Sequence, residues 1–118
     1  TAGSRDFLTF REMPWGELYI QPFTGRVLQR AAFSFGTRLE AFRAACTAMG
    51  GLPLQAGDAG FEFTLLGNYR LRMLLWAGDD EFPPSAQLLY SANFVDGFAA
   101  EDRVVAGDLL CNEIKANL

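Results

Sequence analysis

The segment of residues 71–91 constrains the fold of this chain more than any other part of its sequence. It opens with an apolar run at 71–76 that is typical of a strand, and it becomes acidic at 79–81. Pro83 and Pro84 follow, and a proline restricts both its own backbone and that of the preceding residue. The residues after them again favour a strand. The segment therefore predicts two antiparallel strands joined by a rigid, charged loop.

The start of the chain favours a second pair of strands. Residues 7–13 are rich in β-favouring side chains, and we predict a strand that Pro14 ends. Residues 16–21 are predicted as its partner. A turn through Met13-Pro14-Trp15-Gly16 would make the pair a hairpin.

Two helices are predicted in the middle of the chain. Thr24 is placed to cap the first, over residues 25–33, and Gly36 is placed to end it. The Thr37-Arg38-Leu39-Glu40 sequence is a capping-box pattern that predicts the start of the second. This helix is expected to stop at Gly50-Gly51, and its predicted apolar stripe consists of Leu39, Phe42, Cys46 and Met49.

The second half of the chain favours strands and then a last helix. Residues 61–65 and 69–73 alternate between apolar and polar side chains around a predicted Gly67-Asn68 turn. Leu71, Met73 and Leu75 are expected to face the core, and residues 74–76 to be buried on both faces. From about Ala100, a helix is predicted with these inward residues: Val105, Leu109, Leu110 and Ile114. The fold class is α+β, with a mainly antiparallel sheet of about five or six strands and two or three flanking helices.

The composition of the chain excludes or disfavours several classes of function. The chain has 118 residues, which suits a single domain, and its net charge of −4 disfavours nucleic acid, which needs clustered basic residues. No apolar run reaches the length of a membrane helix, so we expect a cytoplasmic location. The chain has no His, which excludes imidazole-based catalysis within it. Cys46 and Cys111 are isolated and are predicted to be packing residues, so no cofactor is expected within this chain.

One motif carries a family resemblance. Residues 75–86 read Leu-Trp-Ala-Gly-Asp-Asp-Glu-Phe-Pro-Pro-Ser-Ala. This run resembles the motif of domain of unknown function 3786, a family found in anaerobic bacteria and archaea. Residues 10–14, residues 57–63 and the Glu101-Asp102 helix start agree with the family pattern.

The resemblance has modest implications. Family members look longer at the N-terminus, so residues 1–118 are expected to form the C-terminal part of a longer domain. Some members carry an iron–sulfur module upstream, which implies a redox-associated setting; this chain has no Cys-x-x-Cys run to hold a cluster. Where the family has a His-Tyr pair, this chain has Asp96-Gly97. The resemblance implies no particular activity.

The loop contains the candidate binding residues, which are Trp76, Asp79, Asp80, Glu81, Phe82, Pro83, Pro84 and Ser85. Three adjacent carboxylates can bind Mg²⁺ or Ca²⁺, or raise one another's pKa for acid–base work. We favour a solvated turn in which Asp79 bonds to backbone while Asp80 and Glu81 stay exposed. Phe82 and Trp76 could wall a binding platform, although we favour Phe82 as a core residue.

Other polar residues are weaker candidates. Arg11-Glu12 and the pair Arg70 and Arg72 could form anion sites, but solvated strand charges explain them equally well. Ser85 has no His in this chain to activate it as a nucleophile.

The sequence therefore predicts a non-catalytic binding or interaction module rather than an enzyme. We expect it to bind a protein partner or a small ligand and to form a homodimer. The alternative is a metal-dependent hydrolase or lyase that uses Asp79, Asp80 and Glu81.

Overall fold

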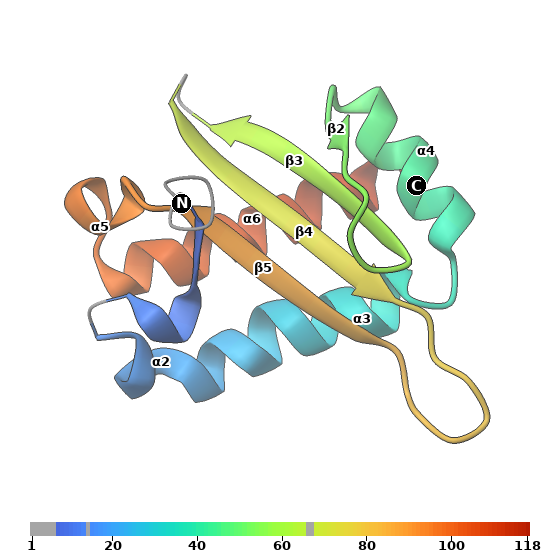
Figure 1. Cartoon of the computed structure of the whole chain (residues 1–118), viewed down its shortest axis with the longest axis horizontal. Helices are drawn as coiled ribbons and strands as arrows, with labels where there is room; N and C mark the ends of the chain where they lie inside the picture. The colour runs from blue at the N-terminus through green and yellow to red at the C-terminus, as the bar shows by residue number, and fades with distance from the viewer. Residues whose placement is uncertain (1–6, 14, 66–67) are drawn as a thin grey trace.

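A computed structural model describes residues 7–13, 15–65 and 68–118, and these contain one antiparallel sheet in the order β1-β5-β4-β3-β2 (Figure 1). The strands are β1 (Phe7–Thr9), β2 (Leu52–Pro53), β3 (Ala59–Leu65), β4 (Tyr69–Trp76) and β5 (Ser85–Ser91). The predicted meander of β3, β4 and β5 and the α+β class are both confirmed. Gly67 of the predicted turn lies outside the described residues, as does Pro14.

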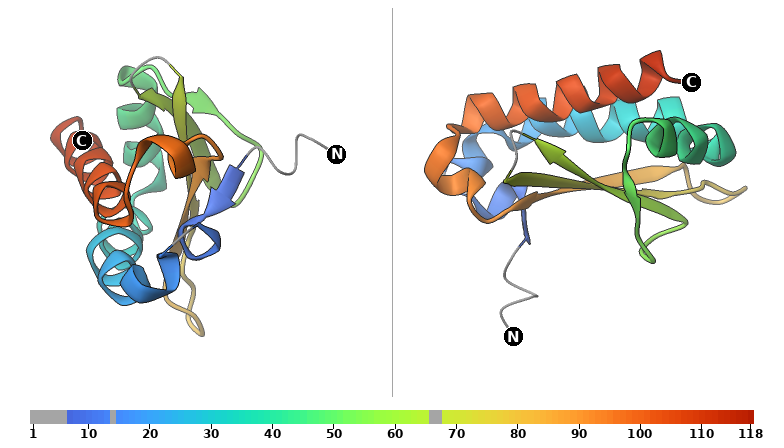
Figure 2. Two further views of the ribbon diagram at one scale, coloured as in Figure 1. Left: turned by 90° about the vertical axis from the view of Figure 1, so that its left-hand side faces the viewer. Right: turned by 90° about the horizontal axis from the view of Figure 1, so that it is seen from above.

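The helices cover one face of this sheet (Figure 2). They are η1 (Phe10–Glu12), α2 (Gly16–Phe23), η2 (Thr24–Gln29), α3 (Arg30–Phe35), α4 (Leu39–Ala48), α5 (Phe94–Gly97) and α6 (Ala100–Ala116). Segments α2, η2 and α3 follow one another without a break, and η2 is a wider π-helical stretch. No helix among the described residues is long and apolar enough to cross a membrane.

Strand β4 carries the centre of the core. Its inward side chains Leu71, Met73 and Leu75 are all buried, as predicted. Phe42 of α4 lies beneath the sheet and meets the Phe61 ring edge-on, at 5.9 Å between centroids. Period-two alternation thus buries one face of the strand and leaves Arg70 and Arg72 on the other.

On the face of β4 opposite Leu71, Met73 and Leu75, the end of the strand is only partly buried. Leu74 is buried beside Gly60, where an added Cβ would lie 2.8 Å from the leucine Cδ2 atom. Trp76 remains 38% exposed. The expectation that residues 74–76 are buried on both faces therefore holds for Leu74 and is wrong for Trp76.

The predicted N-terminal hairpin is wrong. The first strand ends at Thr9, and residues 16–21 belong to helix α2. Phe23 of that helix stacks on Phe10 at 4.2 Å between ring centroids, so aromatic packing overrides the β preference of the segment. A Cβ at position 16 would lie 2.1 Å from the Phe10 carbonyl oxygen, which explains the glycine there.

The predicted helix caps are also wrong. Thr24 lies inside the continuous helical segment rather than at its start. Arg38, without a side-chain capping bond, precedes α4, and Glu40 pairs with Arg43 instead of closing a capping box. A carboxylate bond of the capping-box kind occurs elsewhere, because Glu12 accepts from the Thr9 backbone N–H at 2.8 Å. The predicted end of α3 at Gly36 is confirmed.

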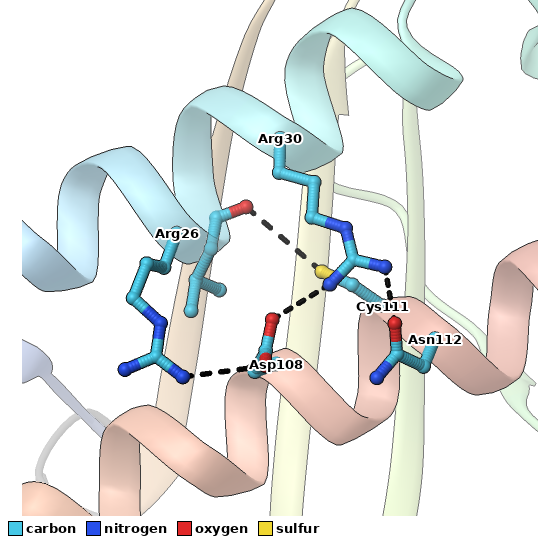
Figure 3. A network of polar contacts seen from close by, with 6 residues as sticks. Arg26, Arg30, Asp108, Cys111 and Asn112 are labelled. Atoms are coloured by element: carbon cyan, nitrogen blue, oxygen red, sulfur yellow. Dashed lines mark hydrogen bonds and ion pairs between the residues drawn. The ribbon is translucent and has the colours of Figure 1, made fainter.

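A polar network joins helix α6 to η2 and α3 (Figure 3). Asp108 accepts from Arg30 at 2.6 Å and pairs with Arg26 at 3.4 Å. Arg30 also donates to Asn112. Leu110 and Ile114 of α6 are buried as predicted, whereas Val105 and Leu109 face outward, so their predicted burial is wrong.

The core position of Leu75 predicts a large and specific loss of stability. Leu75→Ala is expected to lower the free energy of unfolding by about 2 to 5 kcal/mol, because the cavity cannot close around it. Leu18→Ala is the matched control, since Leu18 is 69% exposed and Leu75 is fully buried. Urea denaturation of both variants measures the difference. Equal losses would contradict the assigned strand register.

Candidate functional site

The loop between β4 and β5 is closed by its own hydrogen bonds. The Asp79 backbone N–H donates to the Phe82 carbonyl oxygen at 2.8 Å. The Asp79 Oδ1 atom accepts from the N–H groups of Glu81 and Phe82, both at 2.8 Å. Asp79 is therefore a structural residue of the loop, as predicted from the sequence.

Pro84 holds the loop against the helices. A Cβ at Gly36, which ends α3, would lie 2.4 Å from the Pro84 Cβ atom. A Cβ at Gly78 would lie 2.6 Å from the Pro84 backbone nitrogen. Only glycine allows such close approach at these positions, so the proline sits between two of them.

Asp58 anchors the base of the loop. Its Oδ2 atom accepts from the Ala77 N–H at 2.7 Å, and its own N–H donates to the Leu75 carbonyl oxygen at 2.8 Å. Arg43 of α4 donates to the Asp58 carbonyl oxygen at 2.7 Å. The sequence analysis missed Asp58 and Arg43 as parts of this site. The signal for Asp58 was its place in the 57–63 stretch that agrees with the family pattern.

The tip of the loop projects into solvent, beyond the sheet at the lower right of Figure 1. Asp80 and Glu81 are exposed, as expected. Phe82 is 66% exposed, so its predicted place in the core is wrong and it belongs to the surface of the loop. Pro83 and Ser85 are exposed as well.

A cleft of about 820 Å³ separates the loop from the connection between α3 and α4. Residues 77–84 line one side and residues 36–41 line the other. Arg38 on the far wall directs its guanidinium at the Ser34 carbonyl oxygen, at 3.1 Å. The carboxylates of Asp80 and Glu81 make the loop side of the cleft acidic, whereas Glu40 on the opposite side is paired with Arg43.

The three loop carboxylates do not form a metal centre. In the part of the chain that the structure describes, no group of three or more His, Cys, Asp or Glu residues is arranged to hold a metal ion. The Asp79 Oδ1 atom is instead bonded to the backbone N–H groups of Glu81 and Phe82.

The two strand arginines are paired on the open face of the sheet. Arg72 donates to Glu62 at 2.8 Å and lies 3.8 Å from the centre of the Phe7 ring. Arg70 lies 3.8 Å from the same carboxylate. Glu62 therefore balances one of the two positive charges, and Arg72 is held by this ion pair and by the Phe7 ring.

Cys46 and Cys111 are free and buried. Burial raises the pKa of the Cys46 thiol to about 12 and that of Cys111 to about 11. The thiolate is the reactive form, so both residues are suited to packing rather than redox chemistry.

Thiol chemistry can test this burial. Both cysteines are expected to react with a thiol reagent at neutral pH only after the chain unfolds. Because both folded pKa values lie above the ordinary thiol value of 9.0, their contribution to stability is complete below that pH and declines above it. Mass spectrometry after timed labelling measures the reaction. Rapid labelling of the folded chain would contradict a packing role.

Two variants distinguish the hydrogen-bonded frame of the loop, which includes Asp79, from its exposed tip at residues 80–82. Asp79→Ala is expected to lower the free energy of unfolding by about 1 to 2 kcal/mol, because two backbone N–H groups lose their acceptor. Asp80→Ala, the matched control, is expected to change it by less than about 0.5 kcal/mol, as is usual at exposed positions. Thermal or urea denaturation measures both. A destabilising Asp80→Ala would place that carboxylate in the frame.

Comparison with known proteins identifies the family of this chain. No curated protein and no solved structure matches the chain. The sequence pattern of the family described as Domain of unknown function (DUF3786) matches residues 2–113, nearly the whole chain, and the loop motif lies inside that match. The chain therefore belongs to the DUF3786 family.

Proposed function

We propose that this domain is a non-catalytic binding module whose loop tip recognises a basic, partly apolar segment of a partner protein. The observation that supports this proposal is that the backbone of the loop is fixed while the side chains at its tip are exposed. Its backbone is fixed by Asp79, Asp58 and Pro84, while Asp80, Glu81 and Phe82 project away from the bonded frame.

A fixed loop favours recognition because less conformational entropy is lost on binding. Phe82 offers an exposed aromatic ring, and aromatic side chains often dominate the energy of an interface. The adjacent carboxylates of Asp80 and Glu81 favour a cationic partner. A Lys- or Arg-containing segment with one apolar side chain matches both features.

The wider setting of the module is part of the same proposal. The family resemblance favours an iron–sulfur or redox-associated pathway in an anaerobic bacterium or archaeon, and the hydropathy of the sequence favours a cytoplasmic location. In such a pathway the domain would position a partner rather than transfer electrons itself.

The metal-dependent hydrolase or lyase is the weaker alternative. It needs Asp79, Asp80 and Glu81 to converge on one ion, and Asp79 is bonded to backbone instead. A metal-dependent site would raise the melting temperature when Mg²⁺, Mn²⁺ or Ca²⁺ is added, because a ligand of the folded state stabilises it. We expect no such shift.

Site-specific cross-linking tests the binding site. A photo-reactive phenylalanine at position 82 is expected to capture a discrete partner in cells of the source organism. The same substitution at Phe33 is expected to capture none. Phe33 is a matched control because both residues are 66% exposed and only Phe82 lies in the loop.

The captured partner then allows an affinity measurement. Asp80→Asn combined with Glu81→Gln is expected to weaken binding by about tenfold or more, with an unchanged melting temperature and a weaker dependence on salt. Calorimetry with the purified partner measures the affinity. Equal capture at both positions, or unchanged affinity in the double variant, would overturn the proposal.

A further inference from the structure

Trp15 has an unfavourable backbone conformation at an exposed position. Its φ angle is 65° and its ψ angle is 6°, in the left-handed region that a bulky side chain rarely adopts. The residue is 72% exposed, so little burial of apolar surface offsets this strain. Glycine adopts the same conformation without strain. The stability of the fold therefore does not explain the tryptophan, which favours a role for its ring at the surface.

Trp15 lines a small pocket between the starts of α2 and α6. The pocket has a volume of about 320 Å³, and its other lining residues are Leu18, Tyr19, Ala99 and Glu101. The two helix starts lie at the left of Figure 1, whereas the β4–β5 loop projects at the lower right. The pocket shares no residue with the cleft beside that loop, so it is a separate feature of the molecule.

Glu101 gives this pocket a negative charge. Among the described residues that line the pocket, Glu101 alone is an acid or a base of the Asp, Glu, Lys or Arg type. The Tyr19 hydroxyl donates to its Oε1 atom at 3.1 Å. This bond raises the pKa of Tyr19, so the phenol remains a neutral donor at neutral pH. The bond also holds the carboxylate beside an aromatic residue.

The charges around the pocket favour a cation as well. Glu17 and Asp102 are exposed in the first turns of α2 and α6. The start of each helix carries about half a positive elementary charge, so the three carboxylates exceed the two helix dipoles together. Arg103 follows Asp102, but its side chain is buried and lies over the Phe10 ring at 5.6 Å from the centroid. Its charge is therefore directed into the core.

We propose that Trp15, Tyr19 and Glu101 form a binding site for an organic ammonium group. Tryptophan has the aromatic ring that attracts such cations most strongly, and the Glu101 carboxylate supplies the opposite charge. Leu18, which is 69% exposed, contacts the alkyl groups of the ligand. The volume of the pocket is near the lower limit of about 300 Å³ for ligand sites, which suits a single ammonium head group. A free quaternary ammonium compound and a lysine side chain of another protein both present this chemistry.

A titration with choline, followed by NMR, tests the site. The indole N–H signal of Trp15 is expected to shift saturably in the millimolar range, with Trp76, the other tryptophan, as the internal reference. The alcohol 3,3-dimethylbutan-1-ol has the shape of choline without its charge and is expected to bind about fivefold more weakly or less. Equal affinity for the two compounds would show an apolar pocket without cation selectivity and would overturn the proposal.

Two charge variants separate the role of Glu101 from the general acidity of this surface. Glu101→Gln keeps an acceptor for the Tyr19 hydroxyl but removes the charge, and is expected to weaken choline binding by about fivefold. Glu17→Gln is the matched control, because it removes the same charge from a residue outside the lining. It is expected to weaken binding by less than about twofold. Equal losses in the two variants would overturn the role of Glu101.

Trp15→Gly tests the ring and the strain together. The variant is expected to lose the choline-dependent shift of the Leu18 methyl signals. Its melting temperature is expected to stay the same or to rise, because glycine adopts a φ angle of 65° without strain. A marked fall in the melting temperature would show that Trp15 stabilises the fold, and retained binding would show that the ring is not needed. Either result overturns the site.

The same titration with Nα-acetyl-lysine amide distinguishes the two sources of the ammonium group. Tighter binding of choline supports a free quaternary ammonium ligand. Tighter binding of the lysine compound supports a lysine side chain of a partner protein. If neither compound shifts the Trp15 signal, the proposal is overturned.

Discussion

The structure depends on the burial of a single face of strand β4. Leu71, Met73 and Leu75 of this strand meet the helices, and all three are nearly inaccessible to solvent. Because β4 pairs with β3 on one side and β5 on the other, its register also sets theirs. The loop begins where this strand ends, so the buried central strand of the sheet determines where the acidic tip is held.

Several features could be predicted from the sequence because they depend on neighbouring residues. Alternation identified the β3–β4–β5 meander, and the Asp79 position within a Gly-Asp-Asp-Glu turn identified its bonds to backbone. Other features depend on contacts between distant residues. Helix α2 forms because Phe23 stacks on Phe10, and no local preference of residues 16–21 indicates this. The outward positions of Val105 and Leu109 were hidden for a related reason, since an apolar helix does not reveal which side faces the core.

The candidate site also combines features set by neighbouring residues with features set by distant contacts. Its acidic and aromatic residues are contiguous in sequence, so the sequence alone identified them. Its supports are not contiguous: Asp58 comes from the β2–β3 connection and Gly36 from the end of α3. The exposure of Phe82 could not be deduced from its residue type, because aromatic side chains are mostly buried and this one lies at the end of a closed turn that projects from the sheet.

The contact between Pro84 and Gly36 makes the loop a modular part of the molecule. Positions 36, 78 and 84 fit one another so closely that a side chain larger than hydrogen at either glycine would displace the proline. The side chains of residues 80–82 take no part in that fit and are exposed to solvent. On the proposed function, substitutions at positions 80–82 would alter what the loop recognises while the frame stays the same. The domain would serve equally well as a scaffold on which short recognition sequences are grafted.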